Sequence, residues 1–269
     1  MADYKELKSL KEFDIFDGTF ESIKSHLFMR LFNKHNLPLG KELDSVPYFT
    51  YADMVATLSV ETKDYFSGRR GVYCYMITNE DIKDFGITKE ELRKIAIKNL
   101  QDKNSARIET INQHLVRANV LSPLVNKEDF GTTIQLSGTQ KQINHNTIFS
   151  GDQFGPVMFQ KSDKKNIVLI SNRTQTFASI NFIMPGVLDK VCDIFEEDFY
   201  IVPSSVHEII CVKSSFITND GEKPEKQAIE DLADMLEQIN DVVQTNDKNI
   251  LSYNVYCYVY GDNGVIKVS

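Results

Sequence analysis

The chain has 269 residues, 42% of them hydrophobic and 25% charged, which excludes global disorder and suffices for one large domain or two smaller ones. The formal net charge is -8, and the acidic excess lies in residues 187–269, which hold 16 acidic and 6 basic side chains. This balance argues against a protein that coats nucleic acid, because phosphate neutralisation needs an excess of basic side chains.

Four elements are predicted in the N-terminal part. Apolar residues recur at three- and four-residue steps after Thr19, which predicts an amphipathic helix over residues 19–32. GVYCYMIT, residues 71–78, is rich in β-branched and aromatic residues and predicts a strand. Thr88 and Glu91 match a capping box, so a helix is predicted over residues 88–100, and a further helix over residues 105–118.

The C-terminal part alternates predicted strands and helices. NIVLIS, DFYIV and EIICV predict strands, PGVLDKVCDIF and residues 224–243 predict helices, and NVYCYVYG with VIKV predicts a closing hairpin around residues 261–264. Some neighbouring strands are expected to be joined as hairpins, which favours an α+β fold with a mixed or largely antiparallel sheet packed with several amphipathic helices.

The polar tract at residues 126–156 marks a change of character along the chain. It predicts an N-terminal helical and strand subdomain over residues 1–125 and a C-terminal α+β subdomain over residues 126–269, with one continuous domain as the alternative. His145 and Asp152 lie in this tract, but two ligands do not make a metal site. We therefore expect no metal and no cofactor.

The cysteines and the apolar segments indicate a compartment. Cys74, Cys192, Cys211 and Cys257 lie far apart inside apolar runs, which predicts buried thiols in a reducing compartment. The N-terminal segment lacks the apolar core of a signal peptide, and no window reaches the roughly 18 to 20 apolar residues of a membrane span. We expect a cytoplasmic protein without membrane contacts.

The segment Pro-Ser-Ser-Val-His-Glu, residues 203–208, places hydrolytic residue types close together. On an extended strand Ser205 and His207 would share one face and Glu208 the other, so a local catalytic triad is excluded. The favoured interpretation is a turn whose hydroxyls bond nearby backbone. A binding turn is the alternative, with Ser204, Ser205, His207 and Glu208 as ligand contacts, and we assign no catalytic residue.

Two charged segments are further candidates for binding. SGRRGV, residues 67–72, favours an exposed turn, and anion binding by Arg69 and Arg70 is the alternative, since the segment lacks the Lys-Ser/Thr of a phosphate-binding loop. In the helix at residues 224–243, four acids recur at steps of four, three and four, which gives them one outward face. That face either keeps the protein soluble or docks a basic protein partner; its residues are Glu230, Asp234, Glu237 and Asp241.

Several segments together resemble a bacterial family of unknown function. The resemblance spans about residues 71–260, runs in the same order from VYCYMITNEDI to NILSYNVYCYVY, and is most specific at Pro-Ser-Ser-Val-His-Glu. A more distant similarity extends to the YtpQ-like proteins. The resemblance implies a cytoplasmic protein of bacterial or phage origin and supplies no activity.

These observations favour a non-enzymatic interaction or regulatory protein that recognises a protein partner through its surface. The alternative is a small-molecule or nucleotide-binding protein, or an enzyme, that uses Arg69, Arg70 and the turn at residues 203–208. That alternative requires two segments far apart in the sequence to converge.

Overall fold

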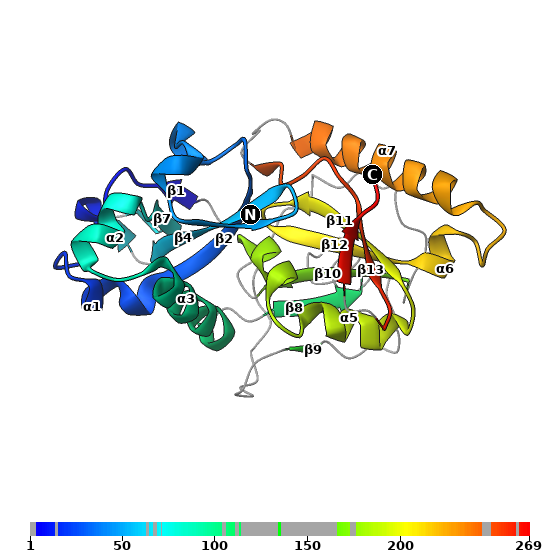
Figure 1. Ribbon diagram of the computed structural model, residues 1–269, viewed down its shortest axis with the longest axis horizontal. Helices are drawn as coiled ribbons and strands as arrows, with labels where there is room; N and C mark the ends of the chain where they lie inside the picture. The colour runs from blue at the N-terminus through cyan, green and yellow to red at the C-terminus, as the bar shows by residue number, and fades with distance from the viewer. Residues whose placement is uncertain are drawn as a thin grey trace.

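A computed structural model shows an α+β fold with two main sheets that lie side by side (Figure 1). Helices α1 to α3 accompany the first sheet, and helices α5 to α7 accompany the second. The structure describes residues 4–13, 16–62, 65–66, 69–70, 72–103, 106–110, 113, 134–135, 166–172, 176–243, 249–261 and 264–269.

The first sheet is mixed. Its strands run in the order β1-β7-β4-β2, with β3 also pairing with β4, and β1 is parallel to β7 whereas the other pairs are antiparallel. A separate antiparallel pair consists of β5 and β6. The strands are β1 (Tyr4–Glu6), β2 (Leu27–Asn33), β3 (Tyr48–Tyr51), β4 (Met54–Thr62), β5 (Tyr65–Phe66), β6 (Arg69–Arg70) and β7 (Val72–Met76).

Helix α3 packs on this sheet after the short helices α1 (Phe20–Ile23) and α2 (Asn79–Phe85). It spans Lys89–Lys103, and the predicted capping box begins it: the Glu91 N–H donates to Thr88 Oγ1 at 3.3 Å, and the Thr88 N–H donates to Glu91 Oε2 at 3.0 Å. Its buried residues are Leu92, Ala96 and Leu100.

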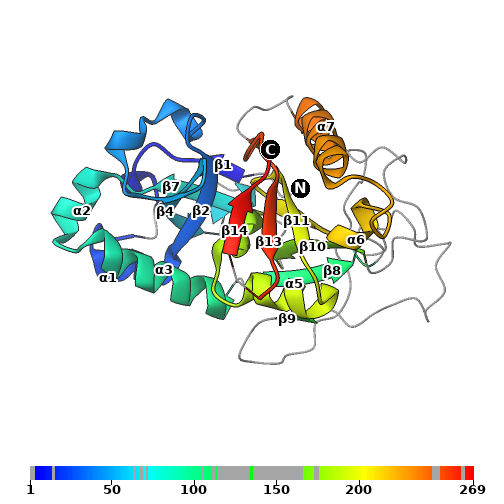
Figure 2. The same cartoon turned by 45° about the vertical axis from the view of Figure 1, so that its right-hand side comes forward.

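The second sheet is antiparallel throughout its described strands, in the order β14-β13-β11-β12-β10-β8-β9. Figure 2 shows β14 and β13 beside the first half of the molecule. The strands are β8 (Ala106–Thr110), β9 (Ile134–Gln135), β10 (Ile167–Asn172), β11 (Phe199–Ser205), β12 (Glu208–Lys213), β13 (Tyr256–Val259) and β14 (Gly264–Lys267).

Helices cover both faces of the second sheet. Along β11, Tyr200 and Val202 pack in a buried cluster with α7 (Glu225–Val243), whereas Phe199 and Ile201 belong to the cluster that contains α5 (Val187–Phe195). This division follows from the two-residue period of a strand, which turns successive side chains to opposite faces. The short helix α6 (Ser214–Ile217) follows β12.

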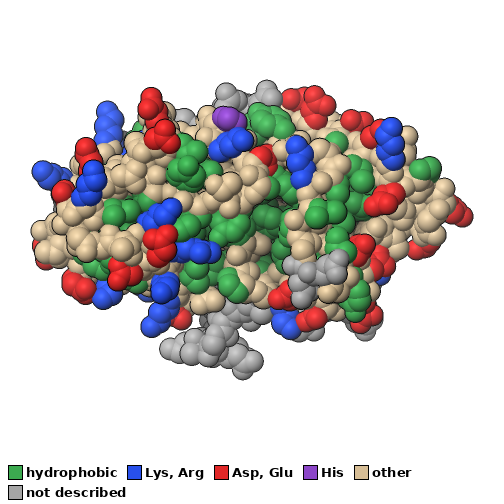
Figure 3. All heavy atoms as spheres, in the orientation of Figure 1, with side chains coloured by type: hydrophobic (Ala, Val, Ile, Leu, Met, Phe, Trp, Pro, Cys, Tyr) green, Lys and Arg blue, Asp and Glu red, His purple; other side chains and the backbone are tan. Residues whose placement is uncertain are grey.

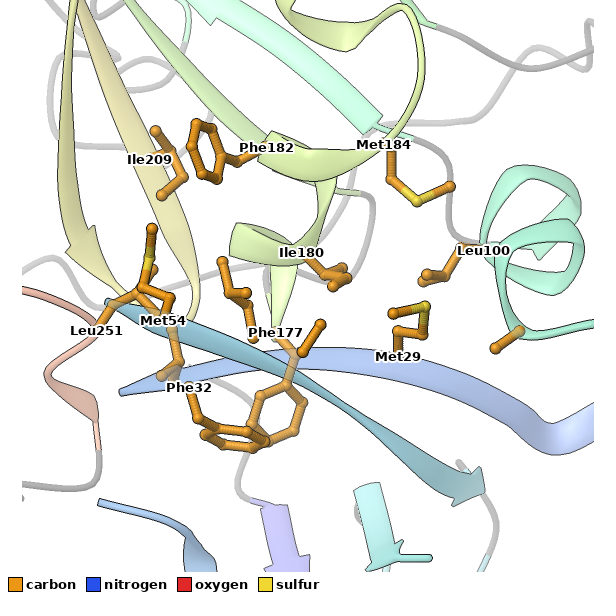
Figure 4. Close-up of a cluster of buried hydrophobic side chains, with 14 of the residues drawn as sticks. Met29, Phe32, Met54, Leu100, Phe177, Ile180, Phe182, Met184, Ile209 and Leu251 are labelled. Atoms are coloured by element: carbon orange, nitrogen blue, oxygen red, sulfur yellow. The ribbon is translucent and has the colours of Figure 1, made fainter. Parts of the chain in front are cut away.

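One hydrophobic core joins the two halves. Met29, Phe32 and Met54 from the first sheet meet Phe177 and Ile180, which lie before and within the 3₁₀-helix η6 (Ala178–Ile183), as Figure 4 shows. The two main sheets divide the chain between β7 and β8. The predicted subdomain boundary between residues 125 and 126 lies outside the described residues.

A charged pair is buried in the first sheet. Arg30 of β2 is 1% exposed; its Nη1 donates to Glu6 Oε2 at 2.7 Å, its Nη2 donates to Glu6 Oε1 at 2.8 Å, and its Nε donates to Ser59 Oγ at 2.8 Å. The guanidinium lies 4.7 Å from the ring centre of Phe177. Burial lowers the pKa of Arg30, but the Glu6 carboxylate together with further negative groups such as Glu61 outweighs burial and raises the pKa, so Arg30 stays charged.

Two predicted helices are wrong. Residues 19–32 form only α1 and a 3₁₀ turn, η2 (Lys24–His26), before the chain extends into β2. Strand β2 is largely buried, with α3 packed on it and Phe177 against Phe32, so its nearly continuous apolar run resembles a helical stripe. The helix predicted over residues 105–118 begins instead with β8, an inner strand between β10 and β9; residues 114–118 lie outside the described residues.

The remaining predicted elements with described residues are confirmed. The strand in residues 71–78 is β7, NIVLIS contains most of β10, and DFYIV with EIICV forms the β11–β12 hairpin. The helices are α5 and α7, the closing hairpin is β13–β14, and the four cysteines are buried. No helix in the described part of the chain is long and apolar enough to cross a membrane.

Candidate functional site

A cleft of about 490 Å³ opens between the two halves of the molecule. Three segments that are distant in sequence line it: the β3–β4 turn, the segment that joins η6 to α5, and the β13–β14 hairpin. Figure 3 shows hydrophobic side chains gathered in the middle of this face. The cleft is therefore a product of the tertiary fold, and none of the three segments forms it alone.

The β3–β4 turn supplies Thr50, Tyr51 and Ala52. Tyr51 pairs with Met54, so Ala52 and Asp53 form a two-residue turn, and Ala52 has a left-handed φ of 53°. Helix α3 fixes this wall, because Arg93 Nη2 donates to Tyr51 Oη at 3.0 Å.

Aromatic rings line the side of the cleft formed by the second sheet. Tyr256 and Tyr258 are two residues apart on β13 and belong to the same buried cluster, whereas Cys257 belongs to the cluster under α7. The ring of Tyr258 stacks on Phe199 with centroids 4.9 Å apart, and the ring of Tyr256 lies 6.4 Å from Phe182. These contacts hold the rings in place before any ligand arrives.

Asp53 fastens the first half to the second beside this cleft. Its Oδ2 accepts hydrogen bonds from Ser252 Oγ at 2.8 Å and from Asn254 Nδ2 at 2.6 Å, and its Oδ1 accepts one from Tyr256 Oη. A carboxylate that accepts three side-chain donors is a strong polar contact. The Asp53 cluster thus fixes both the turn and the Tyr256 ring.

Asp189 is the acidic group of the cleft. Tyr258 Oη donates to Asp189 Oδ1 at 2.8 Å, and burial together with this carboxylate raises the pKa of Tyr258. Asp189 is exposed and keeps lone pairs for a further donor. Among the described residues that line the cleft, none is a histidine or a cysteine. Such a lining can bind an apolar or cationic group, and it presents no nucleophile paired with a base.

Exposed apolar side chains are concentrated in the C-terminal segment, and one of them, Val265, lines the cleft. Strand β14 ends the second sheet, and among the described strands only β13 pairs with it, so its outer N–H and C=O groups face away from the sheet. Of the five large hydrophobic side chains that are exposed in the described part of the chain, four lie in this C-terminal segment: Tyr253 (62%), Tyr260 (57%), Val265 (39%) and Ile266 (53%).

The segment Pro203–Glu208 is the end of a hairpin, as the favoured interpretation predicts. Strand β11 ends at Ser205, β12 begins at Glu208, and Val206 and His207 make the turn. Ser204 Oγ donates to the Glu208 carbonyl at 3.1 Å, and the His207 N–H donates to Ser205 Oγ at 3.1 Å. The two hydroxyls thus bond to nearby backbone.

His207 connects this hairpin to η6. It is 6% exposed, and its Nδ1 accepts a hydrogen bond from the Phe177 N–H at 3.2 Å. Burial lowers the pKa of His207 to about 4, which keeps the ring neutral at physiological pH. The contacts described for Ser204, Ser205 and His207 are structural. Their binding role, and that of Glu208, stays a prediction.

The other residues that the sequence singled out are not among the described residues that line the cleft. Arg69 and Arg70 form β6 and pair with Phe66 and Tyr65, but their side chains lie outside what the structure describes. His145 and Asp152 also lie outside the described residues. Within the described part of the chain, no three His, Cys, Asp or Glu side chains gather closely enough to hold a metal ion.

The predicted acidic face lies on the outside of α7. Figure 3 shows acidic side chains along this part of the surface. Its residues are exposed, and Glu230 has a partner in Lys226, with Nζ and Oε1 3.7 Å apart. The buried side of the helix carries Leu232, Leu236 and Ile239. Its position fits either interpretation of the face, whose members are Glu230, Asp234, Glu237 and Asp241.

Sequence reasoning missed the cleft. The alternation of tyrosines in NVYCYVYG shows that Tyr256 and Tyr258 share a face of a strand, but it does not show that the β3–β4 turn lies opposite them.

Comparison with known families places the chain in one of them. The model of a family of unknown function, DUF5688, matches residues 1–259, so the chain belongs to that family. No curated protein and no solved structure matches the chain.

Proposed function

We propose that this member of the DUF5688 family is a non-enzymatic interaction or regulatory protein that binds a protein partner through its surface. The proposal includes a bacterial or phage origin and a cytoplasmic location. The distant similarity to YtpQ-like proteins and the Pro-Ser-Ser-Val-His-Glu motif are parts of the same proposal and add no activity to it.

The observation that carries the proposal is the concentration of exposed apolar side chains in the C-terminal segment, on both faces of β14 and beside it. Single exposed apolar residues are common on soluble proteins, but a contiguous group of them marks an interaction site. Tyr260, Val265 and Ile266 lie on or beside an outer strand, and such strands are commonly protected with charges, proline or a covering segment. β14 carries one such charge, Lys267, beside its exposed apolar residues. A bound partner would cover both the apolar side chains and the outer backbone groups of β14.

The volume of the cleft favours a second candidate function, binding of a small molecule. Ligand sites commonly measure about 300 to 1,000 Å³ and are lined by aromatic and apolar side chains with a few polar groups. The aromatic lining and Asp189 fit that description. A small-molecule, nucleotide-binding or enzymatic role for Arg69, Arg70 and the 203–208 turn stays a prediction.

The proposal is tested on a partner identified by crosslinking and affinity purification from the native cell. With both proteins purified, we expect Ile266→Ser and Tyr260→Ser each to weaken binding about tenfold, because truncation of a central apolar contact costs about 1 to 2 kcal/mol. Leu39→Ser is the matched control: Leu39 is also an exposed hydrophobic residue, at 42%, but lies outside the C-terminal segment. Its affinity should match that of the wild type.

Unchanged affinity in Ile266→Ser and in Tyr260→Ser, with melting temperatures equal to that of the wild type, would contradict this choice of surface. A screen of metabolites by thermal shift tests the second candidate, because a ligand that binds only the folded state raises its melting temperature. A stabilising metabolite whose effect disappears in Tyr258→Phe would favour the small-molecule function instead.

A further inference from the structure

We propose that the partner docks as an extended segment that adds a strand to β14 and places an arginine or lysine side chain in the cleft beside Asp189. This inference rests on the proposed function and names the chemistry of the partner. It joins the outer strand, the aromatic cleft and the acidic C-terminal third into one binding surface.

The geometry of β14 supports strand addition. β14 pairs with β13 along one edge, with Val265 opposite Tyr258 and Lys267 opposite Tyr256. An added strand would lie about 4.8 Å beyond β14, and every second side chain would turn to the face of the sheet that Val265 shares. Because Val265, Tyr256 and Tyr258 all line the cleft, those alternate side chains turn toward it.

The distance across β14 selects a long side chain. The backbone of an added strand lies two strand spacings, roughly 10 Å, from β13. A valine or threonine at that position would contact Val265, but only a long side chain would extend over β14 to the hydrogen bond between Tyr258 and Asp189. Arginine and lysine combine that length with an apolar stem, which suits the apolar walls of the cleft.

The charge of the site selects a cation. Asp189 offers an exposed carboxylate, and tyrosine ring faces attract cations. Two basic groups on elements beside the cleft are engaged: Lys190 pairs with Asp193 at 2.7 Å, and Arg93 donates to Tyr51. Lys267 of β14 is exposed on the face that Val265 shares, so the basic side chain of the segment has to lie toward Asp189 and away from Lys267. Residues 187–269 as a whole hold 16 acidic and 6 basic residues, so long-range attraction favours a basic segment over an acidic one.

A displayed library of random twelve-residue peptides, selected on the immobilised full chain at low salt, tests the inference. We expect the selected sequences to alternate β-branched or aromatic residues with polar ones and to share an arginine or lysine at one position. A synthetic peptide from this pool should slow amide hydrogen exchange in β14. Replacing its basic residue with glutamine should weaken binding about tenfold, as expected for loss of a charge-assisted hydrogen bond.

Variants of the protein identify the partner of that basic residue. Asp189→Asn keeps an oxygen that can accept from Tyr258 Oη but loses the charge, so it should weaken binding of the basic peptide about tenfold and leave the glutamine peptide unaffected. Glu196→Gln is the matched control, because Glu196 is an exposed acid at the C-terminal end of the same helix and does not line the cleft. It should change neither affinity.

Three results would overturn the inference. If the selected peptides share no basic residue but still fail to bind Ile266→Ser, the basic side chain is ruled out and the proposed function stands. Binding that leaves hydrogen exchange in β14 unchanged removes strand addition. Failure to select any peptide removes the extended segment altogether, and the affinity of the purified partner for Ile266→Ser then decides the proposed function separately.

Discussion

Replacing Glu6 with glutamine removes the negative charge that faces Arg30 inside the first sheet. Arg30 is 1% exposed and the side chain of Glu6 is 6% exposed, so water cannot replace the lost carboxylate without opening the structure. Removing one partner of a buried ion pair costs about 3 to 5 kcal/mol of unfolding free energy, because the other charge stays buried without compensation.

Three contacts of Arg30 survive the substitution and set the expected magnitude. Its Nε still donates to Ser59 Oγ, and its guanidinium still lies 5.1 Å from the ring centre of Phe32 and 4.7 Å from that of Phe177. Desolvated cation–π contacts are worth up to about 2 kcal/mol, and glutamine still offers one neutral acceptor. We therefore expect Glu6→Gln to lower the unfolding free energy by about 3 kcal/mol, the lower end of the range.

Urea unfolding followed by far-UV circular dichroism measures this loss, since the chain contains no tryptophan to serve as a fluorescent probe. Glu21→Gln is the surface control: Glu21 pairs with Lys24 at 3.1 Å in an exposed position, and its loss should cost about 0.5 kcal/mol or less. The double variant Glu6→Leu with Arg30→Met removes both buried charges and should regain most of the stability lost in Glu6→Gln.

A loss below about 1 kcal/mol in Glu6→Gln would refute the reasoning, because it would place the pair in the range of solvated surface contacts. So would a double variant that is less stable than Glu6→Gln, since burial of an isolated charge could then not be the main cost.

Three further predictions concern the turn, the cleft and the acidic helix. Burial lowers the pKa of His207 from 6.5 to about 4, so between these pH values the unfolded chain binds a proton that the folded chain excludes. The unfolding free energy should therefore fall by up to about 3 kcal/mol as pH drops from about 6.5 to 4. His207→Gln should flatten this part of the plot of unfolding free energy against pH. Asp53→Ala should lower the unfolding free energy by about 3 kcal/mol in urea titration, because Ser252 and Tyr256 lose a charged acceptor; an unchanged midpoint would contradict the described cluster. The triple variant Glu230→Lys, Asp234→Lys and Glu237→Lys should leave the circular dichroism spectrum unchanged but weaken partner binding in surface plasmon resonance, more strongly at low salt than at high salt. If the variant and the wild type bind the partner with equal affinity at low and at high salt, the acidic face has only a solubility role.

Local signals were sufficient for much of the fold. The capping box of Thr88 and Glu91, the turn at Pro203–Glu208 and the apolar stripe of α7 each depend on residues within a few positions of one another, so sequence spacing reports them directly. The α+β class followed from the alternation of such elements.

The errors occur where tertiary packing decides the structure. Leu27–Asn33 has apolar residues at spacings that suit a helix, but β4 pairs with this segment along its whole length and fixes it as a strand. Ala106–Thr110 is similarly held between β10 and β9. None of these partner strands directly adjoins in sequence the segment with which it pairs, so no local pattern indicates the pairings.

The candidate site was beyond prediction for the same reason. Tyr51 and Tyr258 line one cleft although about 200 residues separate them, and Asp53 carries no motif that relates it to Tyr256. The sequence singled out residues such as His207 because the polar groups of a tight hairpin are close together in the chain. That closeness reflects the turn and does not indicate a binding site.

The Asp53 cluster has a consequence for the order in which the molecule assembles. Its three hydrogen bonds join residues separated by 199, 201 and 203 positions, so they close a loop that contains most of the chain. Closing a loop of that length is entropically costly, and contacts of such separation slow folding. During synthesis the first sheet is complete long before Ser252 leaves the ribosome. The cleft is therefore expected to form last, and a chain that lacks the β13–β14 hairpin would have no cleft to which a partner could bind.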